Sequence, residues 1–189
     1  MRVDQASAQS ALDDIAEIEA RTAQAAIYGA SGASLILWGV VVALAYLMNQ
    51  FFPAAAGSIW LCAWTTGFVG TVLISWRWKR RSSEKHRMTT QLVLAQVVLI
   101  LFGILFLWLL PPSSPRQTAA FWPLVFMMGY VIAGLWLGRF FILCGILVSA
   151  LTVIGYLYSG PWLLLWMALA NGGALIAGGL YLRKVGLQP

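Results

Sequence analysis

The chain has 189 residues, of which 61% are hydrophobic and only 10% are charged, and its formal net charge is +6. A water-soluble domain typically has about a quarter charged residues, so a chain with this much apolar surface is expected to reside mostly in lipid. The basic residues lie beside apolar stretches rather than in a separate basic domain. This arrangement favours a membrane topology signal and argues against nucleic-acid binding.

The first thirty residues are polar and acidic, and they lack the basic and apolar regions of a signal peptide. Ser10 can cap a helix, and two aspartates follow in its first turn, where the helix dipole favours negative charge. Residues 10–28 are therefore predicted to form a short amphipathic cytoplasmic helix within an N-terminal segment, 1–30. Gly29 and Gly32 are predicted to break or bend this helix.

Six apolar stretches follow and make up the second predicted region, residues 31–189. A helix rises 1.5 Å per residue, so roughly 20 residues cross a hydrocarbon core about 30 Å thick. Lipid-exposed backbone must satisfy its own hydrogen bonds, so these stretches predict helices. The stretch 122–138 is short and is expected to tilt little or to thin the bilayer locally. The predicted spans are 33–52, 55–76, 90–110, 122–138, 140–158 and 161–182.

The distribution of Lys and Arg predicts the orientation of these spans. The connection 77–87 holds six basic residues, and placing it in the cytoplasm with six spans also places both termini and Arg139 there. Of the twelve basic residues, only Arg116 then faces outward, as the positive-inside rule requires. The sequence therefore predicts an all-α, polytopic bundle of six transmembrane spans with both ends in the cytoplasm.

The positions of the ionisable residues exclude several kinds of chemistry. Every Asp and Glu lies at position 84 or before it, and none lies inside a predicted span. Proton relays, cation-coupled transport and most intramembrane hydrolysis use buried carboxylates or histidine. The single histidine, His86, lies in the basic connection, and Cys62 and Cys144 are predicted to differ in depth by about 15 Å, too far for a disulfide. We therefore expect no enzyme activity, metal or cofactor.

A polar layer is predicted near the middle of the membrane. Asn171 precedes two glycines that can loosen its helix, which is consistent with a site for a neutral solute or a lipid between helices. Ordinary interhelical hydrogen bonds explain the same side chains and are the favoured interpretation. The predicted mid-membrane polar cluster consists of Thr65, Thr66, Ser149, Thr152 and Asn171.

The basic connection is a candidate site for anionic lipid headgroups, because each Lys or Arg near an anionic surface contributes about 1 kcal/mol to binding. A plain topology signal accounts for the same residues equally well. The candidate headgroup-binding residues are Arg77, Lys79, Arg80, Arg81, Lys85 and Arg87.

Small residues at helical spacing predict close helix contacts. They occur as Gly134 with Gly138, Gly145 with Ser149, and Gly67 near Gly70. Such surfaces serve packing within one bundle or a contact between copies in a homo-oligomer, and packing within the monomer is the default expectation.

Two functions remain compatible with these features. The first is a non-enzymatic regulatory or scaffold role, in which residues 10–28 and the basic connection bind a protein or lipid at the cytoplasmic face. The alternative is a small transporter or channel for a neutral solute, without coupling through a membrane carboxylate. In size and hydropathy the chain is similar to small six-helix inner-membrane proteins of bacteria, which implies a multi-pass location in the cell inner membrane.

Overall fold

The computed structural model describes residues 5–79 and 86–186, and this part of the chain is helical apart from short turns. The first five helices are α1 (Gln5–Phe51), α2 (Ala56–Lys79), α3 (His86–Leu109), α4 (Pro115–Leu137) and α5 (Arg139–Tyr158), and the turn η1 (Pro53–Ala55) joins α1 to α2. The last helical segment consists of the turn η2 (Gly160–Trp162), α6 (Leu163–Met167), a π-helical segment η3 (Ala168–Gly172) and α7 (Gly173–Gly186).

Among the described residues, five helical segments are long and apolar enough to cross a membrane, and the absence of strands there confirms the predicted all-helical class. They are Ser31–Phe51, Pro53–Arg77, Pro115–Leu137, Arg139–Tyr158 and Gly160–Lys184. Helix α3 contains a shorter apolar stretch, Leu94–Leu109.

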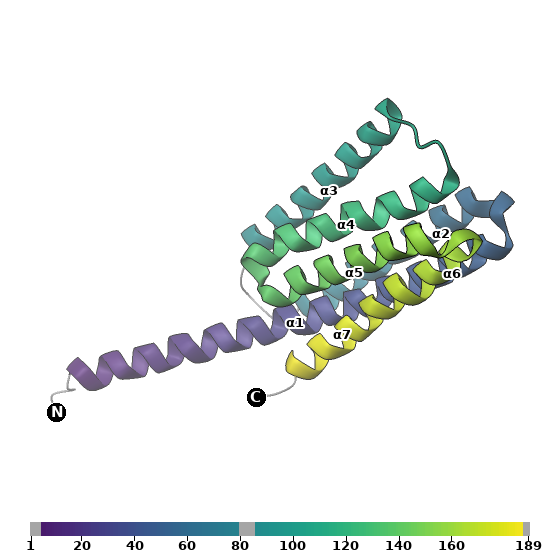
Figure 1. The fold of residues 1–189 in the computed structure, drawn as a ribbon. Helices are drawn as coiled ribbons and strands as arrows, with labels where there is room; N and C mark the ends of the chain where they lie inside the picture. Colours follow the sequence, from purple (N-terminus) through teal and green to yellow (C-terminus); the bar gives the residue numbers. More distant parts are fainter. Residues whose placement is uncertain (1–4, 80–85, 187–189) are drawn as a thin grey trace.

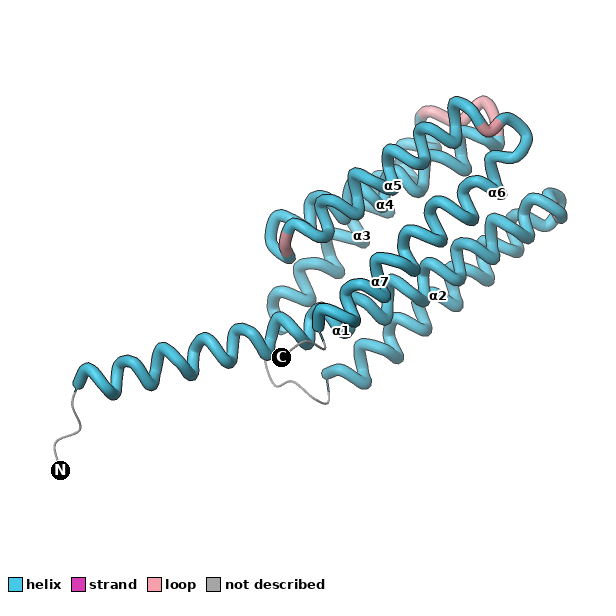
Figure 2. Tube along the Cα trace, turned by 60° about the horizontal axis from the view of Figure 1, so that its bottom comes forward, coloured by secondary structure: helices cyan, strands magenta, loops and turns pink. Residues whose placement is uncertain are grey.

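The helices form a bundle with both chain ends at the same side (Figure 1). Helix α1 packs against α7 and α2, α4 packs against α5, and α3 contacts α4. In Figure 2, α3, α4 and α5 lie together on one side, and α1, α2 and α7 lie together on the other. Helix α5 joins the two groups, because it contacts α6, η3 and α7.

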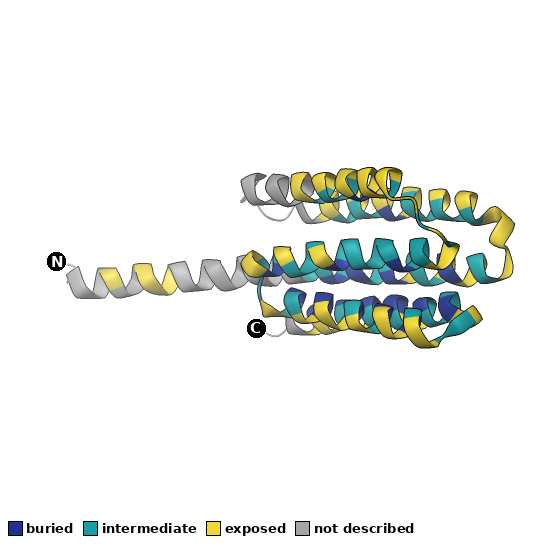
Figure 3. Cartoon of the chain, turned by 45° about the horizontal axis from the view of Figure 1, so that its top comes forward, coloured by how far each residue is buried: buried dark blue, intermediate teal, exposed yellow. Residues whose placement is uncertain are grey.

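Buried side chains gather on the faces that the helices turn toward one another, whereas the outer faces are exposed (Figure 3). The larger of the two buried clusters joins Leu35 of α1, Met127 of α4, Val148 of α5 and Leu175 of α7. Large apolar side chains such as Phe102 of α3, which is 67% exposed, cover the outer faces. A surface of this composition is stable against lipid tails and not against water.

Helix α1 corrects one prediction from the sequence. It runs for 47 residues, so of the predicted break or bend at Gly29 and Gly32 the break is wrong. Gly32 instead allows close packing: a Cβ added there would lie 2.8 Å from the carbonyl oxygen of Gly179 in α7. The helix therefore continues from the bundle into the N-terminal segment without interruption, and its 47 residues measure about 70 Å at the usual helical rise.

Helix α4 corrects a second prediction. The fourth span was expected to be short, at 122–138, but the helix begins at Pro115 and has 23 residues. The hydroxyl of Ser114 accepts a hydrogen bond from the backbone N–H of Gln117, and Pro115 occupies the first turn, where its missing N–H costs nothing. A helix of 23 residues is long enough to cross the hydrocarbon core, so no local thinning of the bilayer is needed. Pro123 lies inside this helix.

The predicted small-residue contacts lie within the chain. A Cβ on Gly134 would lie 2.7 Å from the backbone nitrogen of Ile142, and a Cβ on Gly145 would lie 2.8 Å from the carbonyl oxygen of Met127. Both glycines therefore serve the contact between α4 and α5. Gly67 and Gly70 of α2 lie against side chains of α1, as packing within the monomer predicts.

Candidate functional site

Asn171 lies in η3, the π-helical segment between α6 and α7. The sequence predicts a loosened helix at this position. The Asn171 side chain is only 2% exposed, and Thr152 of α5 is fully buried beside it. The Thr152 hydroxyl lies 3.1 Å from Asn171 Oδ1 and 2.8 Å from the carbonyl oxygen of Val148, so one proton serves two acceptors. The Asn171 amide Nδ2 donates to the sulfur of Met167 at 3.2 Å.

Of the five predicted polar residues, the structure brings only Thr152 and Asn171 together. Ser149 lies one turn before Thr152 on α5 and is half-buried. Thr65 and Thr66 lie on exposed positions of α2, and the Thr65 hydroxyl donates to the carbonyl oxygen of Leu61 in its own helix at 2.8 Å. The predicted cluster is therefore a buried pair, with the other three side chains placed elsewhere.

The pair is covered by large side chains. Met167 is fully buried, and the indole of Trp166 packs against Gly155 while it donates to the carbonyl oxygen of Leu151 at 2.8 Å. The groups at this position are neutral donors and acceptors. They can bind a polar uncharged group or hold helices together, but they cannot act as a general acid or base at neutral pH.

Replacing Thr152 with valine tests the contribution of this pair to stability. Valine keeps the shape and removes the only hydroxyl donor to Asn171, so we expect the free energy of unfolding in detergent to fall by about 0.5–1.5 kcal/mol. Thr65→Val is the matched control, because the Thr65 hydroxyl bonds only within its own exposed helix; its effect should stay within about 0.5 kcal/mol. Equal effects of the two substitutions would contradict a role of the pair in joining α5 to η3.

A further hydrogen bond, between α1 and α4, was not predicted from the sequence. The hydroxyl of Tyr46 in α1 donates to the carbonyl oxygen of Ala119 in α4 at 2.8 Å, and Tyr46 is 2% exposed. Ala119 lies four residues before Pro123, which has no N–H to donate to that carbonyl. Pro123 could have indicated this bond in the sequence, because a proline inside a helix leaves a backbone carbonyl without its N–H donor. In lipid another group must donate to that carbonyl.

Arg116, the one basic side chain that the sequence predicts to face outward, lies at the start of α4. This end of the bundle is opposite the end that carries the chain termini (Figure 1). The Arg116 guanidinium donates to the carbonyl oxygen of Tyr156 at 2.9 Å and lies over the Tyr156 ring, 5.6 Å from its centroid. Arg116 is thus held by α5 rather than free for a ligand.

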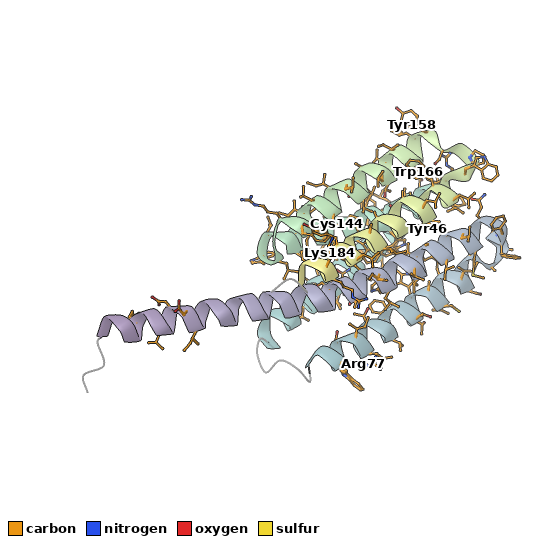
Figure 4. All side chains as sticks on the ribbon, turned by 90° about the horizontal axis from the view of Figure 1, so that it is seen from below. Tyr46, Arg77, Cys144, Tyr158, Trp166 and Lys184 are labelled. Carbon is orange, nitrogen blue, oxygen red and sulfur yellow. The ribbon has the colours of Figure 1, made fainter. Side chains whose placement is uncertain are left out.

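The cationic end of the bundle is the second candidate site. Arg77, Arg139, Arg183 and Lys184 are exposed, and Figure 4 shows Arg77 and Lys184 at the end from which α1 projects. A surface cavity of about 380 Å³ lies beside Leu73, Ile74, Trp76 and Arg77. Of the other predicted headgroup-binding residues, Lys79 and Arg87 lie near the ends of α2 and α3, and Arg80, Arg81 and Lys85 lie outside the described residues.

Both cysteines are free: Cys62 is exposed on α2 and Cys144 is buried on α5. Within residues 5–79 and 86–186, no three His, Cys, Asp or Glu side chains converge to hold a metal ion. The chain matches no protein-family model, and comparisons with curated proteins and with solved structures give no significant match.

Proposed function

We propose that the chain crosses the cell inner membrane six times with both ends in the cytoplasm. The five long apolar segments supply five spans, and α3, which has 24 residues and the apolar stretch Leu94–Leu109, supplies the sixth. With this threading, Arg77, Arg139, Arg183 and Lys184 share the cytoplasmic side and Arg116 alone faces outward, which agrees with the positive-inside rule.

The function proposed for this protein is non-catalytic: it binds a protein partner at its cytoplasmic face and acts as a regulator or scaffold. One observation carries this proposal. The N-terminal half of α1 extends beyond the bundle (Figure 1). It exposes the apolar side chains Leu12 and Ile15 beside the acidic Asp13 and Asp14. An exposed helix of this kind, continuous with a membrane span, is suited to hold a partner near the membrane.

A pull-down tests the proposed function. Full-length protein and a chain that lacks residues 1–28 are purified from cells after crosslinking, and their co-purifying proteins are compared. We expect partners that are present only with the full-length chain. The control carries Leu12→Ser and Ile15→Ser in the full-length chain and should lose the same partners. Identical partner sets for all three proteins would contradict the proposal.

A second function is supported by the Thr152–Asn171 pair. Helix segments with π-helical turns are often found at functional sites, and here the turn carries a buried, neutral polar side chain. The corresponding activity is transport of a small neutral solute between the two helix groups. Flux of a polyol such as glycerol into liposomes should fall with Asn171→Leu and persist with Thr65→Val. Flux that is equal to that of protein-free liposomes would remove this alternative.

A further inference from the structure

Inside the bundle, α1 presents one continuous line of residues to α7. A Cβ added to Gly32 would lie 2.8 Å from the carbonyl oxygen of Gly179, and one added to Gly39 would lie 2.8 Å from that of Gly172. Ile36 lies between these two positions, against Gly179. The line is spaced by four and three residues in turn, which is the spacing of a coiled-coil seam. We call these residues the α7-facing seam.

The seam does not stop where α7 stops. The two glycine contacts set an antiparallel register that brings Gly186, the last residue of α7, level with Ala25 of α1. Residues 5–24 of the same unbroken helix, about 30 Å at the helical rise, extend past this point (Figure 1). In the sequence the spacing of four and three continues through Gly29, Ala25, Thr22, Ile18, Ile15 and Ala11.

Beyond α7 the seam includes Ile15, which is exposed, and the sequence places acidic residues beside it. Ile15 lies on the seam and is 54% exposed, and Leu12 beside it is 61% exposed. At 100° per residue, Asp14 and Glu19 take the positions on either side of the seam, whereas Asp13 and Glu17 take the opposite face. Residues 1–28 hold five acidic and only two basic residues. Arg21 takes the edge position seven residues after Asp14, so a helix that covers the seam would meet an acidic residue at each edge, at Asp14 and Glu19, and one basic residue at Arg21.

We propose that a cationic amphipathic helix of a cytoplasmic protein binds residues 8–24 of α1, in line with α7 and on the same seam. The proposal rests on the proposed function and names the chemistry of its partner. The seam is continuous with an interface that α7 already forms, and α7 carries the basic residues Arg183 and Lys184 in its last turn. Lys or Arg at the edges of the partner helix would pair with Asp14 and Glu19.

Two other occupants fit less well. In a parallel pair of copies from the same membrane, Asp14 of one copy would lie against Glu19 of the other, and like charges at these edge positions oppose pairing. A membrane surface rich in anionic lipid would repel the acidic edges in the same way.

Two synthetic helical peptides test the proposal. They share one apolar stripe of Ile and Leu with the spacing of four and three, and they carry either Lys or Glu at the edge positions. Binding to the full-length protein in phosphatidylcholine nanodiscs is measured by fluorescence anisotropy at physiological salt. We expect the Lys peptide to bind at least about tenfold more tightly than the Glu peptide.

Two charge-reversed proteins provide matched controls. Asp14→Lys with Glu19→Lys changes the edges of the seam, and Asp13→Lys with Glu17→Lys makes the same change of net charge on the far face. The first pair should weaken binding of the Lys peptide by about tenfold, and the second by less than about threefold, because charges beyond about 8 Å are largely screened.

The proposal is overturned if the two peptides bind equally, or if the two charge-reversed proteins lose equal affinity. It is also overturned if Ile15→Cys in a Cys62→Ser background crosslinks efficiently between copies, which would make a second copy the occupant. These failures would leave the pull-down unaffected: if deletion of residues 1–28 still removed partners, the proposed function would stand and only the cationic-helix assignment would be lost.

Discussion

Replacing Gly172 with leucine is expected to destabilise the protein more than any other single substitution considered. A Cβ at this position would lie 2.5 Å from the Cβ of Ala43 and 3.0 Å from the carbonyl oxygen of Gly39. Backbone of α1 cannot move aside as a flexible side chain can, so the two helices must separate. We expect the free energy of unfolding, measured by SDS titration in mixed micelles, to fall by about 3 kcal/mol or more.

Gly173 provides the control for this substitution because it is the next residue of the same segment. A Cβ there would meet no atom within 4 Å, and leucine favours a helix over glycine by up to about 1 kcal/mol. Gly173→Leu should therefore leave the stability unchanged or raise it. Similar losses at the two positions would show that the contact of α1 with η3 does not depend on the absence of a side chain at Gly172.

Removing the Tyr46 hydroxyl is expected to give the second largest effect. Tyr46→Phe keeps the ring contact with Trp60, whose centroid lies 4.9 Å away, but it leaves the carbonyl oxygen of Ala119 without a donor. Since Pro123 cannot supply an N–H, this carbonyl becomes an unsatisfied group in an apolar region. We expect the free energy of unfolding to fall by about 1–2 kcal/mol in the same SDS titration.

A double-mutant cycle separates this effect from general packing. Pro123→Ala restores a backbone N–H four residues after Ala119, so in that background the carbonyl no longer needs the tyrosine. Tyr46→Phe should then cost less, with an interaction energy of about 1 kcal/mol between the two positions. If Tyr46→Phe has the same effect in both backgrounds, the Tyr46 hydroxyl does not replace the missing N–H of the proline.

The existence of the helices was predictable from the sequence because it depends on composition and length alone. A run of about 20 apolar residues in lipid has only the helix as a structure that satisfies its backbone. The ends were harder to predict: the polar Arg116 and Gln117 led to a start of the fourth span at 122, whereas capping by Ser114 extends α4 back to Pro115. Capping acts locally and can add a polar turn to an apolar helix.

The contacts between helices were predictable only in part. Gly134 and Gly145 have a small residue four positions away, a spacing that the sequence analysis recognised, and they indeed lie at the α4–α5 contact. The contact of α1 with η3 and α7 uses glycines seven residues apart, Gly32 with Gly39 and Gly172 with Gly179. Each pair allows close packing only because the other pair faces it. Segments far apart in the sequence give no local sign that they meet.

The candidate polar site shows the same limit. Depth along a helix follows from counting residues, so the sequence placed Thr152 and Asn171 at a similar level, and they do form a hydrogen bond. Rotation about the helix axis does not follow from counting when a helix is apolar on all sides, as α2 is. Thr65 and Thr66 were therefore grouped with the buried pair, although they lie on exposed positions of α2.

Labelling of introduced, exposed cysteines in spheroplasts, with the native Cys144 buried, tests the six-span threading most directly. In a Cys62→Ser background, Ser113→Cys reports on the connection between α3 and α4, and Gln9→Cys reports on the projecting part of α1. A membrane-impermeant maleimide should label Ser113→Cys in intact spheroplasts and Gln9→Cys only after permeabilisation. Labelling of Gln9→Cys from outside, with Ser113→Cys protected, would contradict the proposed orientation and with it the cytoplasmic location of the exposed seam.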